Sequence, residues 1–581
     1  MVGTTKSSPD ASFFFQGLSM QMQVAYRQRS SVMTTPTAVA MALAPNLRRD
    51  RVSYVGMLKD ALHFREAISA LHDVVISDLR YKPKDNSAYE AYQQEVRRRE
   101  AVIRTGATSK ALTALHQALP EIPVGFEDHF RKVRTLYWGK RQDYSNYLSR
   151  HDPEVWRLLM PCDPVITVAP DTVFFECFSA DESSYGCLSV DRDRFIQERD
   201  VALGTTNVDY SWNLYEHFQQ LRSYRQTQFS IDPSGFESKT TDTDGHREEK
   251  IDLPNSWLRG FMQLQAAMGL PTRKVPLSRE ALYSILAFLK RNKAKRSPRA
   301  LRFDLDPGKP VKLTLEPWNR EIHLPTTLYP GQRAETIRIW GRDRLHLLSR
   351  LLPIMDRAEV YLLGTGFPSF WVLHLGGMRL TLGLSGWTTN DWTGASGLDQ
   401  LAPPANPSAD LLGDLAGVFR NAPALTFEQL RSRTGASVPY TAAGLNKLAL
   451  LGQIIYDIPA NLYRWRQIMP PEVSLEKVQF DNPETVAAKD LMARKQVKLE
   501  TNDKRPDGLQ IIAGKVGERP VSLLLDADGR MLRAKCTCSH HFTGGLKRGP
   551  CRHLQAARTK ALGHTTEQVK SVEQWFNALW N

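Results

Sequence analysis

Three of the chain's six cysteines lie within eighteen residues near the C-terminus, and their spacing constrains the fold more than any other feature. The pattern is Cys536-Thr-Cys538, then twelve residues, then Cys551-Arg-His553. Zinc is held in proteins by four thiolate or imidazole ligands arranged as a tetrahedron. Two close pairs of such ligands, separated by a loop, therefore predict one zinc ion bound by these four residues.

The flanking sequence predicts a scaffold for this ion. The stretch "PVSLLLDADGRMLRAKCTC" is typical of a hairpin with a return strand over about 531–535, so Cys536 and Cys538 leave the strand on one side. The stretch "GPCRHLQAARTKAL" predicts a loop entering a helix near Cys551, where the helix N-terminus favours a thiolate. Four protein ligands fill the tetrahedron, so we expect a closed, structural site.

The loop between the two ligand pairs leaves one alternative open. His540 and His541 lie in it and could replace one of the four ligands. Three thiolates and one neutral imidazole around Zn²⁺ sum to about −1. Basic residues around the motif can offset that charge: Lys535, Lys547, Arg548 and Arg552.

The pattern Cys-x-Cys, spacer, Cys-x-His resembles the SWIM zinc finger, and the four residues match it position by position. The resemblance covers about 470–565, including the hairpin before Cys536. It implies zinc binding and no particular reaction, since the family is associated with both DNA binding and protein contacts.

Residues 406–468 carry a second pattern. "SADLLGDLAGVFRN", "TFEQLRSRTGAS" and "YTAAGLNKLALLGQIIYD" predict three helices, and "QIIYDIPANLYRWR" predicts a two-stranded wing. This order is that of a winged helix, which binds DNA in some proteins and packs against protein in others. With the finger, it supplies the predicted nucleic-acid contacts: Arg431, Arg433, Lys447, Arg464, Arg466, Lys547, Arg548 and Arg552.

The central region, 156–392, is expected to be α+β. "VITVAPDTVFFECFSADESSYGCLSVD" predicts two or three strands, and its cysteines are interpreted as buried apolar residues. Segments beginning at Thr205 and Thr336 match at an offset of 131, which favours duplicated β-α-β-β units. Two such units side by side are similar to the sheet platforms of clamp-like folds. The segment "KRNKAKRSPR" is either a phosphate-binding patch or a solvated helix end.

The remaining boundaries complete a multidomain α+β prediction. Residues 1–155 are expected to be mainly helical, 393–468 to hold a linker and the winged-helix-like domain, and 469–581 to hold the finger and C-terminal helices. The chain has no apolar run of membrane-spanning length and no secretory signal pattern, so we expect a cytoplasmic protein with reduced thiols.

The net charge of +14 favours polyanionic partners, DNA or RNA first. The sequence shows no phosphate-binding loop, no H-E-x-x-H and no G-x-S-x-G, so we expect no enzyme of those classes. A metal-dependent nuclease or transposase stays an alternative, with Asp304 and Asp306 as a candidate carboxylate pair.

The whole chain is similar to a group of bacterial SWIM zinc finger proteins. The similarity lies in "VFFECFSADESSYGCLSV", "LLGTGFPSFWVLHLGGMRLTLGLSGW" and "GPCRHLQAAR". It implies an accessory role beside a MoxR-type AAA+ ATPase and a von Willebrand factor A-domain protein. Our hypothesis is a non-enzymatic, zinc-stabilised protein that binds nucleic acid, with a pure protein–protein adaptor as the alternative.

Overall fold

The computed structural model of the 581-residue chain divides into two compact units. One is Met1–Ser77 together with Cys162–Asn581, and the other is Asp78–Pro161. Helix α3 (Phe126–His151) is the element described in the second unit. The structure describes residues 30–34, 37–43, 45, 51–77, 126–151, 164–208, 215, 218–231, 255–295, 297–386, 392, 397–403, 405–468 and 483–563.

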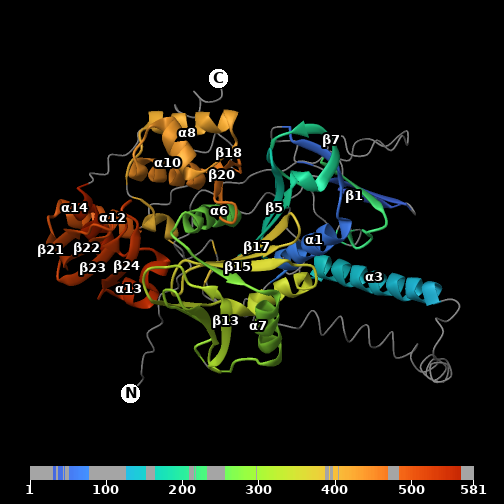
Figure 1. Cartoon of the computed structure of the whole chain (residues 1–581), viewed down its shortest axis with the longest axis horizontal. Helices are drawn as coiled ribbons and strands as arrows, with labels where there is room; N and C mark the ends of the chain where they lie inside the picture. Colours follow the sequence, from blue (N-terminus) through green and yellow to red (C-terminus); the bar gives the residue numbers. More distant parts are fainter. Residues whose placement is uncertain are drawn as a thin grey trace, which may run out of the picture. The chain divides into compact units, whose positions relative to one another are not determined.

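An eight-stranded antiparallel sheet is the centre of the larger unit (Figure 1). Its order is β10 (Arg273–Leu277), β15 (Arg357–Leu362), β16 (Ser369–His374), β17 (Met378–Leu384), β6 (Ser184–Asp191), β5 (Thr172–Phe178), β4 (Val165–Val168) and β8 (Gly204–Asn207). Every residue of β5 is buried, as a continuous apolar run predicts for a strand covered on both faces. Cys177 faces α1 (Ala61–Val75), and Phe178 packs on Phe261 of α6 (Asn255–Met268). The sequence predicts two or three strands in this stretch, and the structure has three, β4, β5 and β6.

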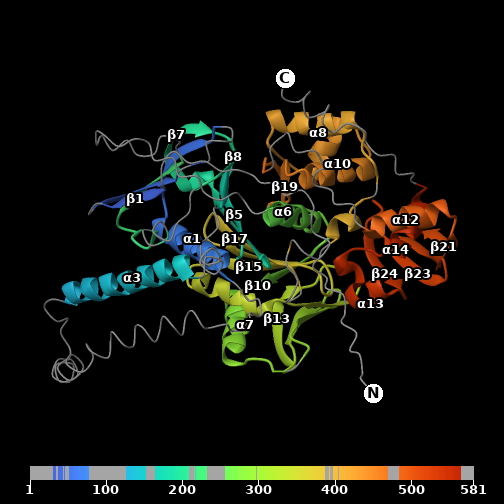
Figure 2. The same ribbon diagram turned by 180° about the vertical axis from the view of Figure 1, so that it is seen from behind.

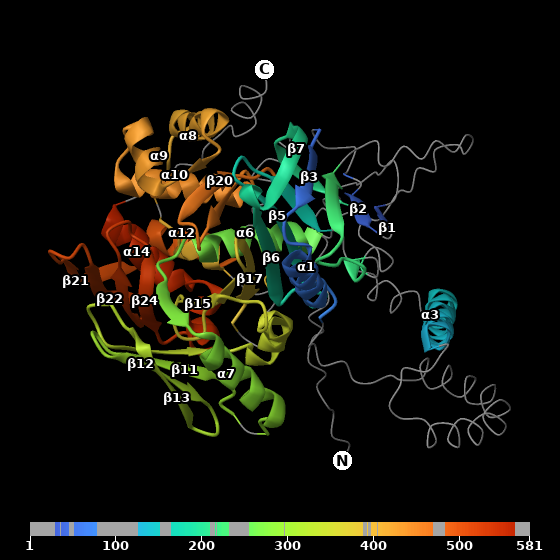
Figure 3. The ribbon, with the colours of Figure 1, turned by 45° about the vertical axis from the view of Figure 1, so that its right-hand side comes forward.

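A five-stranded sheet lies beside α1 (Figure 3). Its order is β1 (Ser31–Thr34), β2 (Ala38–Leu43), β9 (Gln226–Ile231), β3 (Ser53–Leu58) and β7 (Phe195–Ala202), and a one-turn helix, η1 (Arg192–Arg194), precedes β7. The prediction that residues 1–155 are mainly helical is therefore wrong for 31–58. Strand β1 pairs with β2, but β2 pairs with β9, and β3 pairs with β7 and β9, more than a hundred residues along the chain, which local periodicity does not reveal.

A four-stranded antiparallel sheet completes the central region. Its order is β13 (Arg320–Leu328), β12 (Pro310–Leu315), β11 (Leu301–Leu305) and β14 (Glu335–Ile339), with α7 (Arg279–Arg291) before it and η2 (Arg342–Leu351) after it. Alternate residues of β11 are buried, the pattern of a sheet with one covered face.

Two parts of the larger unit share one pairing scheme, the first containing α1 and the strands from β3 to β9, the second containing α7 and the strands from β10 to β15. Figure 2 shows α1 and α7 from behind. In the first part, β3 pairs antiparallel with β9, and β4 lies between β5 and β8. In the second part, β10 pairs antiparallel with β15, and β11 lies between β12 and β14. Helices α1 and α7 each follow the first strand of their part. Strands β9 and β15 begin and end 131 residues apart, which matches the offset seen in the sequence. Leu214 and the strand expected near 234–238 lie outside the described residues.

Residues 405–468 form a small helical domain with its own core. It contains α8 (Ala409–Asn421), β18 (Ala424–Leu425), α9 (Phe427–Thr434), α10 (Val438–Leu450), β19 (Ile454–Asp457) and β20 (Leu462–Trp465). The hydroxyl of Thr426 and the side chain of Gln429 form a capping box at α9, and Gly435 ends that helix with φ of 67°. Three helices followed by a hairpin is the order that the sequence predicts here. The linker expected to precede them is described in part.

The C-terminal part is a four-stranded antiparallel sheet, β21 (Val497–Lys504), β22 (Gln510–Val516), β23 (Arg519–Leu525) and β24 (Met531–Cys536), with helices on one face. The helices are α12 (Pro483–Ala493), α13 (Ser539–Gly544), η4 (Gly545–Arg548) and α14 (Arg552–Leu562); η3 (Leu398–Leu401) packs beside them. Among the described residues, no helix combines the length and the apolar character of a membrane span.

Candidate metal centre

The four predicted ligands occupy the junction of one strand and two helix starts. Cys536 ends β24, Cys538 is the N-cap of α13, and Cys551 is the N-cap of α14, with His553 in the first turn of that helix. The return strand and the helix start were both expected from the sequence, and both are confirmed within a residue or two.

These side chains converge on one point. One ligand atom from each of Cys536, Cys538, Cys551 and His553 lies within 4.8 Å of the others. The Cys536 sulfur is 3.8 Å from Nδ1 of His553. Ligands about 2.0–2.3 Å from a tetrahedral zinc ion are about 3.3–3.8 Å apart, so a small adjustment would complete the shell. The cluster can hold one metal ion.

The electrostatics of the cluster also fit a cation. Hydrogen bonding to the Cys551 thiol and to His553 lowers the pKa of Cys536 to about 3. The nearby Cys536 sulfur and burial raise the pKa of Cys551 well above its usual range. Close sulfurs resist ionising together unless a positive ion lies among them. A bound metal cation would therefore allow Cys536 and Cys551 to be thiolates at the same time.

The site is enclosed. Cys551 is completely buried, while Cys536 and Cys538 are each 8% exposed. The main-chain N–H of His541 donates to the Cys538 sulfur over 3.4 Å. Such N–H···S bonds hold a ligating sulfur in place and favour its thiolate form.

His540 and His541 lie beside the cluster without joining it. The group of ligand atoms found among the described residues contains the sulfurs of the three cysteines and a ring nitrogen of His553, and neither His540 nor His541. Burial lowers the pKa of His541. The structure therefore gathers the set of four that the spacing predicts.

Glu484 is a contact of the site that the sequence does not reveal. Its carboxylate accepts hydrogen bonds from the main-chain N–H of Arg552 at 2.7 Å and from the Arg552 guanidinium at 2.6 Å. An acid at the start of α14 also matches the positive end of the helix dipole. Glu484 thus joins α12 to the helix that carries Cys551 and His553.

The loop between the ligand pairs packs on the central region. The Lys547 ammonium lies 5.6 Å from the centre of the Trp340 ring, and burial lowers its pKa to about 8. A Cβ on Gly397 would come within 2.9 Å of the Arg548 carbonyl oxygen, so the backbones touch there. Of the basic residues expected to meet phosphate near the motif, Lys547 is half-buried, Arg552 is paired with Glu484 and Arg548 is exposed.

The predicted wing arginines point inward, which corrects the expectation that they contact phosphate. Arg466 is fully buried and its Nη1 lies 2.8 Å from the Glu176 carboxylate on β5. Arg464 is 2% exposed and pairs with Asp457 at 3.0 Å and with Asp171. The ion pairs of Arg464 with Asp171 and of Arg466 with Glu176 hold the β19–β20 hairpin against the eight-stranded sheet.

The other three expected contacts of this domain lie on its helices. Arg431 and Arg433 are exposed on α9, where Arg431 pairs with Glu428 at 3.0 Å. Lys447 on α10 is half-buried, and burial lowers its pKa. The structure therefore leaves Arg431 and Arg433 as the exposed pair.

The carboxylate pair considered for a nuclease is already neutralised. Asp304 pairs with Arg302 at 3.3 Å and lies 3.7 Å from the Lys312 ammonium, while Asp306 lies 3.8 Å from Lys309. Within the described ranges, the cysteine–histidine cluster is the one group of three or more potential ligands that comes together.

Two remaining sequence features have structural roles. Cys177 and Cys187 are buried, as expected, and Cys162 lies outside the described residues. Burial beside Glu176 raises the pKa of Cys187 to about 12, so it is an unreactive thiol. In the segment "KRNKAKRSPR", Lys290 and Arg291 are exposed in the last turn of α7, where cations favour the helix dipole.

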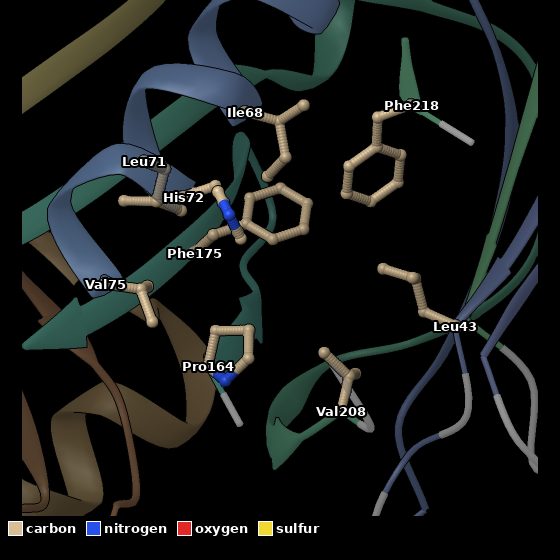
Figure 4. Close-up of a pocket in the computed structure, with 9 residues that line it drawn as sticks. All are labelled: Leu43, Ile68, Leu71, His72, Val75, Pro164, Phe175, Val208 and Phe218. Atoms are coloured by element: carbon tan, nitrogen blue, oxygen red, sulfur yellow. The ribbon is translucent and has the colours of Figure 1, made fainter. Parts of the chain in front are cut away.

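A small apolar cavity under α1 offers no ligand site (Figure 4). Its volume is about 10 Å³, and His72 is the one polar residue among its nine lining side chains. A buried water needs comparable space and two to four polar partners. This cavity is a packing feature of the core.

Comparison with known proteins does not identify a family. No protein-family model and no curated protein matches the chain. Proliferating cellular nuclear antigen of Entamoeba histolytica is 12% identical over 39% of this chain and 89% of its own, with a TM-score of 0.25. The antigen of A. fulgidus, bound to a FEN-1 C-terminal region, is 14% identical over 39% and 89%, with a TM-score of 0.27. That of Thermococcus kodakaraensis is 12% identical over 39% and 90%, with a TM-score of 0.26. We draw no conclusion from TM-scores this low.

Proposed function

We propose that this chain is a non-enzymatic, zinc-stabilised adaptor that binds another protein. The observation that carries the proposal is the closed Cys₃His cluster, which joins β24, α13 and α14 and whose loop packs against Trp340 of the central region. Four protein ligands leave a tetrahedral zinc ion no open position for a substrate or a catalytic water. In this proposal the ion stabilises the C-terminal sheet domain, a SWIM-type finger, and holds its surface in place.

The buried wing supports a protein-binding role over DNA reading. A winged helix that inserts its wing into DNA needs exposed cations there, whereas Arg464 and Arg466 are engaged by carboxylates inside the molecule. We therefore interpret 405–468 as a winged-helix domain used for packing. Its exposed α9 remains available to a partner.

The proposed partners come from the resemblance to bacterial SWIM zinc finger proteins. That resemblance implies a MoxR-type AAA+ ATPase and a von Willebrand factor A-domain protein, in the cytoplasm. Nucleic-acid binding is the second candidate function, because the chain carries a net charge of +14 and exposes Arg431 and Arg433 together on α9.

The test uses the purified, zinc-loaded full chain. Sedimentation velocity with a purified MoxR-type ATPase and A-domain protein should show a complex that persists after the salt concentration is raised. A salt series with duplex DNA and with RNA runs in parallel, since phosphate contacts weaken steeply with salt. Tight, salt-sensitive nucleic-acid binding without a protein complex would replace the adaptor proposal with the second candidate.

A further inference from the structure

A groove of about 1220 Å³ lies between the C-terminal sheet and the central region. Strand β24 and its neighbours form one wall, and β14 with the turn around Thr365 forms the other. Figure 3 shows the two sheets that supply these walls, β21–β24 and β11–β14. No function assigned above uses this groove.

Both walls are sheet edges. Strands β14 and β24 are each the last strand of their sheet. Consecutive residues of both strands, 334–337 and 531–535, line the groove. Each of these two strands has a paired neighbour in its sheet on one side, β11 for β14 and β23 for β24, so its other edge is directed away from its own sheet. Such an edge offers main-chain donors and acceptors to an added strand.

One end of the β14 edge is already occupied by a turn of the chain. The Thr365 hydroxyl donates to the Thr336 carbonyl oxygen at 3.3 Å, and the Gly366 N–H donates to the Arg338 carbonyl oxygen at 2.7 Å. The chain itself thus pairs with the later residues of β14. Residues 334 and 335, which precede this turn contact, line the groove.

The outer face of the C-terminal sheet is more apolar than a solvent-facing sheet requires. Leu523 and Ile512 are buried, and α14 contacts all four strands of this sheet. Their neighbours Leu524 and Ile511 point to the other face, are directly opposed across β22 and β23, and are half-buried in the groove wall. This gives the groove an apolar strip next to its edge.

The groove is also positively charged. Five basic side chains and two acidic ones line it, Arg273, Arg333, Arg533, Lys535 and Lys547 against Glu335 and Asp507, an excess of three positive charges. Two ion pairs cross from wall to wall. Arg333 lies 2.7 Å from Asp507, and Arg533, itself 70% exposed, lies 3.6 Å from Glu335. The Arg333–Asp507 pair is exposed and contributes little to stability. Glu335 is largely buried and also pairs with Arg273 at 2.9 Å, so it keeps a cation when Arg533 turns to another carboxylate.

We propose that this groove binds an extended acidic segment of a protein partner, which adds as a strand between the edges of β14 and β24. The segment alternates apolar residues, set against Leu524 and Ile511, with carboxylates that meet Arg533 and Lys535. An inserted strand needs about 10 Å between the edges, two interstrand steps. The inference rests on the adaptor function and names the chemistry of its partner.

The same features disfavour a single-stranded nucleic acid in this groove. Bases bind by stacking on aromatic side chains, and the lining holds two, Tyr329 and Phe367. Glu335 and Asp507 would repel phosphates. Edge hydrogen-bonding groups have no regular match in a sugar–phosphate backbone, whereas they match a polypeptide residue by residue.

The test uses fluorescence anisotropy with the zinc-loaded full chain and a labelled peptide of about ten alternating glutamate and valine residues, the length of a strand. The peptide should bind, and Lys535→Glu should weaken it at least about tenfold because like charges would then oppose each other. The matched control is Lys515→Glu, an exposed lysine on β22 outside the groove lining, which should leave binding within about twofold. Leu524→Asp should also weaken the peptide.

Two further probes and hydrogen exchange complete the design. A lysine–valine peptide should not bind, and polyglutamate should bind more weakly because it lacks the apolar residues. In the complex, amide exchange should slow at 334–335 and 532–535. Three results would overturn the inference. Polyglutamate could bind as tightly as the glutamate–valine peptide, Lys515→Glu could weaken the peptide as much as Lys535→Glu does, or an oligothymidylate could bind more tightly than the peptide.

Failure of this inference and failure of the adaptor function give different results. If the ATPase or A-domain protein binds and Lys535→Glu has no effect on it, the groove is not the contact and the adaptor function stands. If the peptide binds as described while neither protein does, the groove proposal stands and the named partners are wrong. Zinc content is measured on every variant, so a misfolded finger is recognised directly.

Discussion

Replacing Arg466 by methionine should loosen the β19–β20 hairpin from the eight-stranded sheet. Arg466 and Glu176 are both fully buried, with Nη1 and Oε1 2.8 Å apart. The Tyr185 hydroxyl donates to the same carboxylate oxygen at 2.7 Å. Methionine fills similar space but leaves Glu176 as a buried charge without its cation.

The magnitude follows from that uncompensated charge. Removing one partner of a buried ion pair costs about 3–5 kcal/mol. Native-state hydrogen exchange at the amides of β20 should therefore speed up by about two to three and a half powers of ten, since each 1.4 kcal/mol is tenfold. Exchange at α9 should change less, because β20 contacts the eight-stranded sheet through Arg464 and Asp171, whereas α9 packs within the small core of 405–468.

Two variants isolate the cause. Arg433→Met, at an exposed arginine of the same domain, should change stability by no more than about 0.5 kcal/mol. Combining Arg466→Met with Glu176→Leu should recover most of the loss, because apolar pairs often replace buried ion pairs at no cost. The Nε and Nη2 atoms of Arg466 have no hydrogen-bond partner among the described residues, which favours that recovery. A loss under about 1 kcal/mol in Arg466→Met would refute the reasoning.

Three further predictions concern the metal centre and its surroundings. Cys551→Ser should lose zinc and lower the melting temperature of the C-terminal domain, whereas the control Cys187→Ser should keep one zinc per chain. Atomic absorption measures the zinc content, and calorimetry measures the melting temperature. Lys547→Met should flatten the pH dependence of stability between about pH 8 and 10.5, because the lysine pKa is about 8 in the fold against an ordinary 10.5. The unfolded chain then binds more protons in that window, so wild-type stability rises with pH, and melting curves across it show whether the variant differs. Glu484→Gln should cost about 1–2 kcal/mol by weakening its bonds to Arg552 while zinc is retained; loss of the ion would assign Glu484 a larger role.

The zinc site could be predicted from the sequence because its ligands are close in the chain. The turn before Met531 and the helix after Cys551 are local signals, and four ligands within eighteen residues leave few arrangements. Glu484 lies 68 residues before Arg552, and no local pattern marks it as a contact. Trp340 is more distant still from Lys547.

The β19–β20 hairpin is a segment whose basic composition led to a wrong prediction of phosphate contacts. Arg464 and Arg466 alternate with aromatic residues in a short hairpin, as cations of a DNA-binding wing would. Their role depends on Asp171 and Glu176, about 290 residues earlier, which only the folded sheet brings to them. Strands β2 and β3 were missed for a similar reason, since their partners β7 and β9 lie more than a hundred residues along the chain. The 131-residue spacing was visible because apolar residues of the two segments match at this offset, among them Phe229 with Val360 and Ile231 with Leu362.

The central claim is that one zinc ion fills a closed Cys₃His shell. Zinc K-edge X-ray absorption of the purified full chain, with metal content measured on the same sample, tests it most directly. The account predicts one zinc per chain, with three sulfurs at about 2.3 Å and one nitrogen at about 2.0–2.1 Å. Less than stoichiometric zinc after reconstitution, or a shell in which an oxygen replaces one of the four ligands, would contradict it.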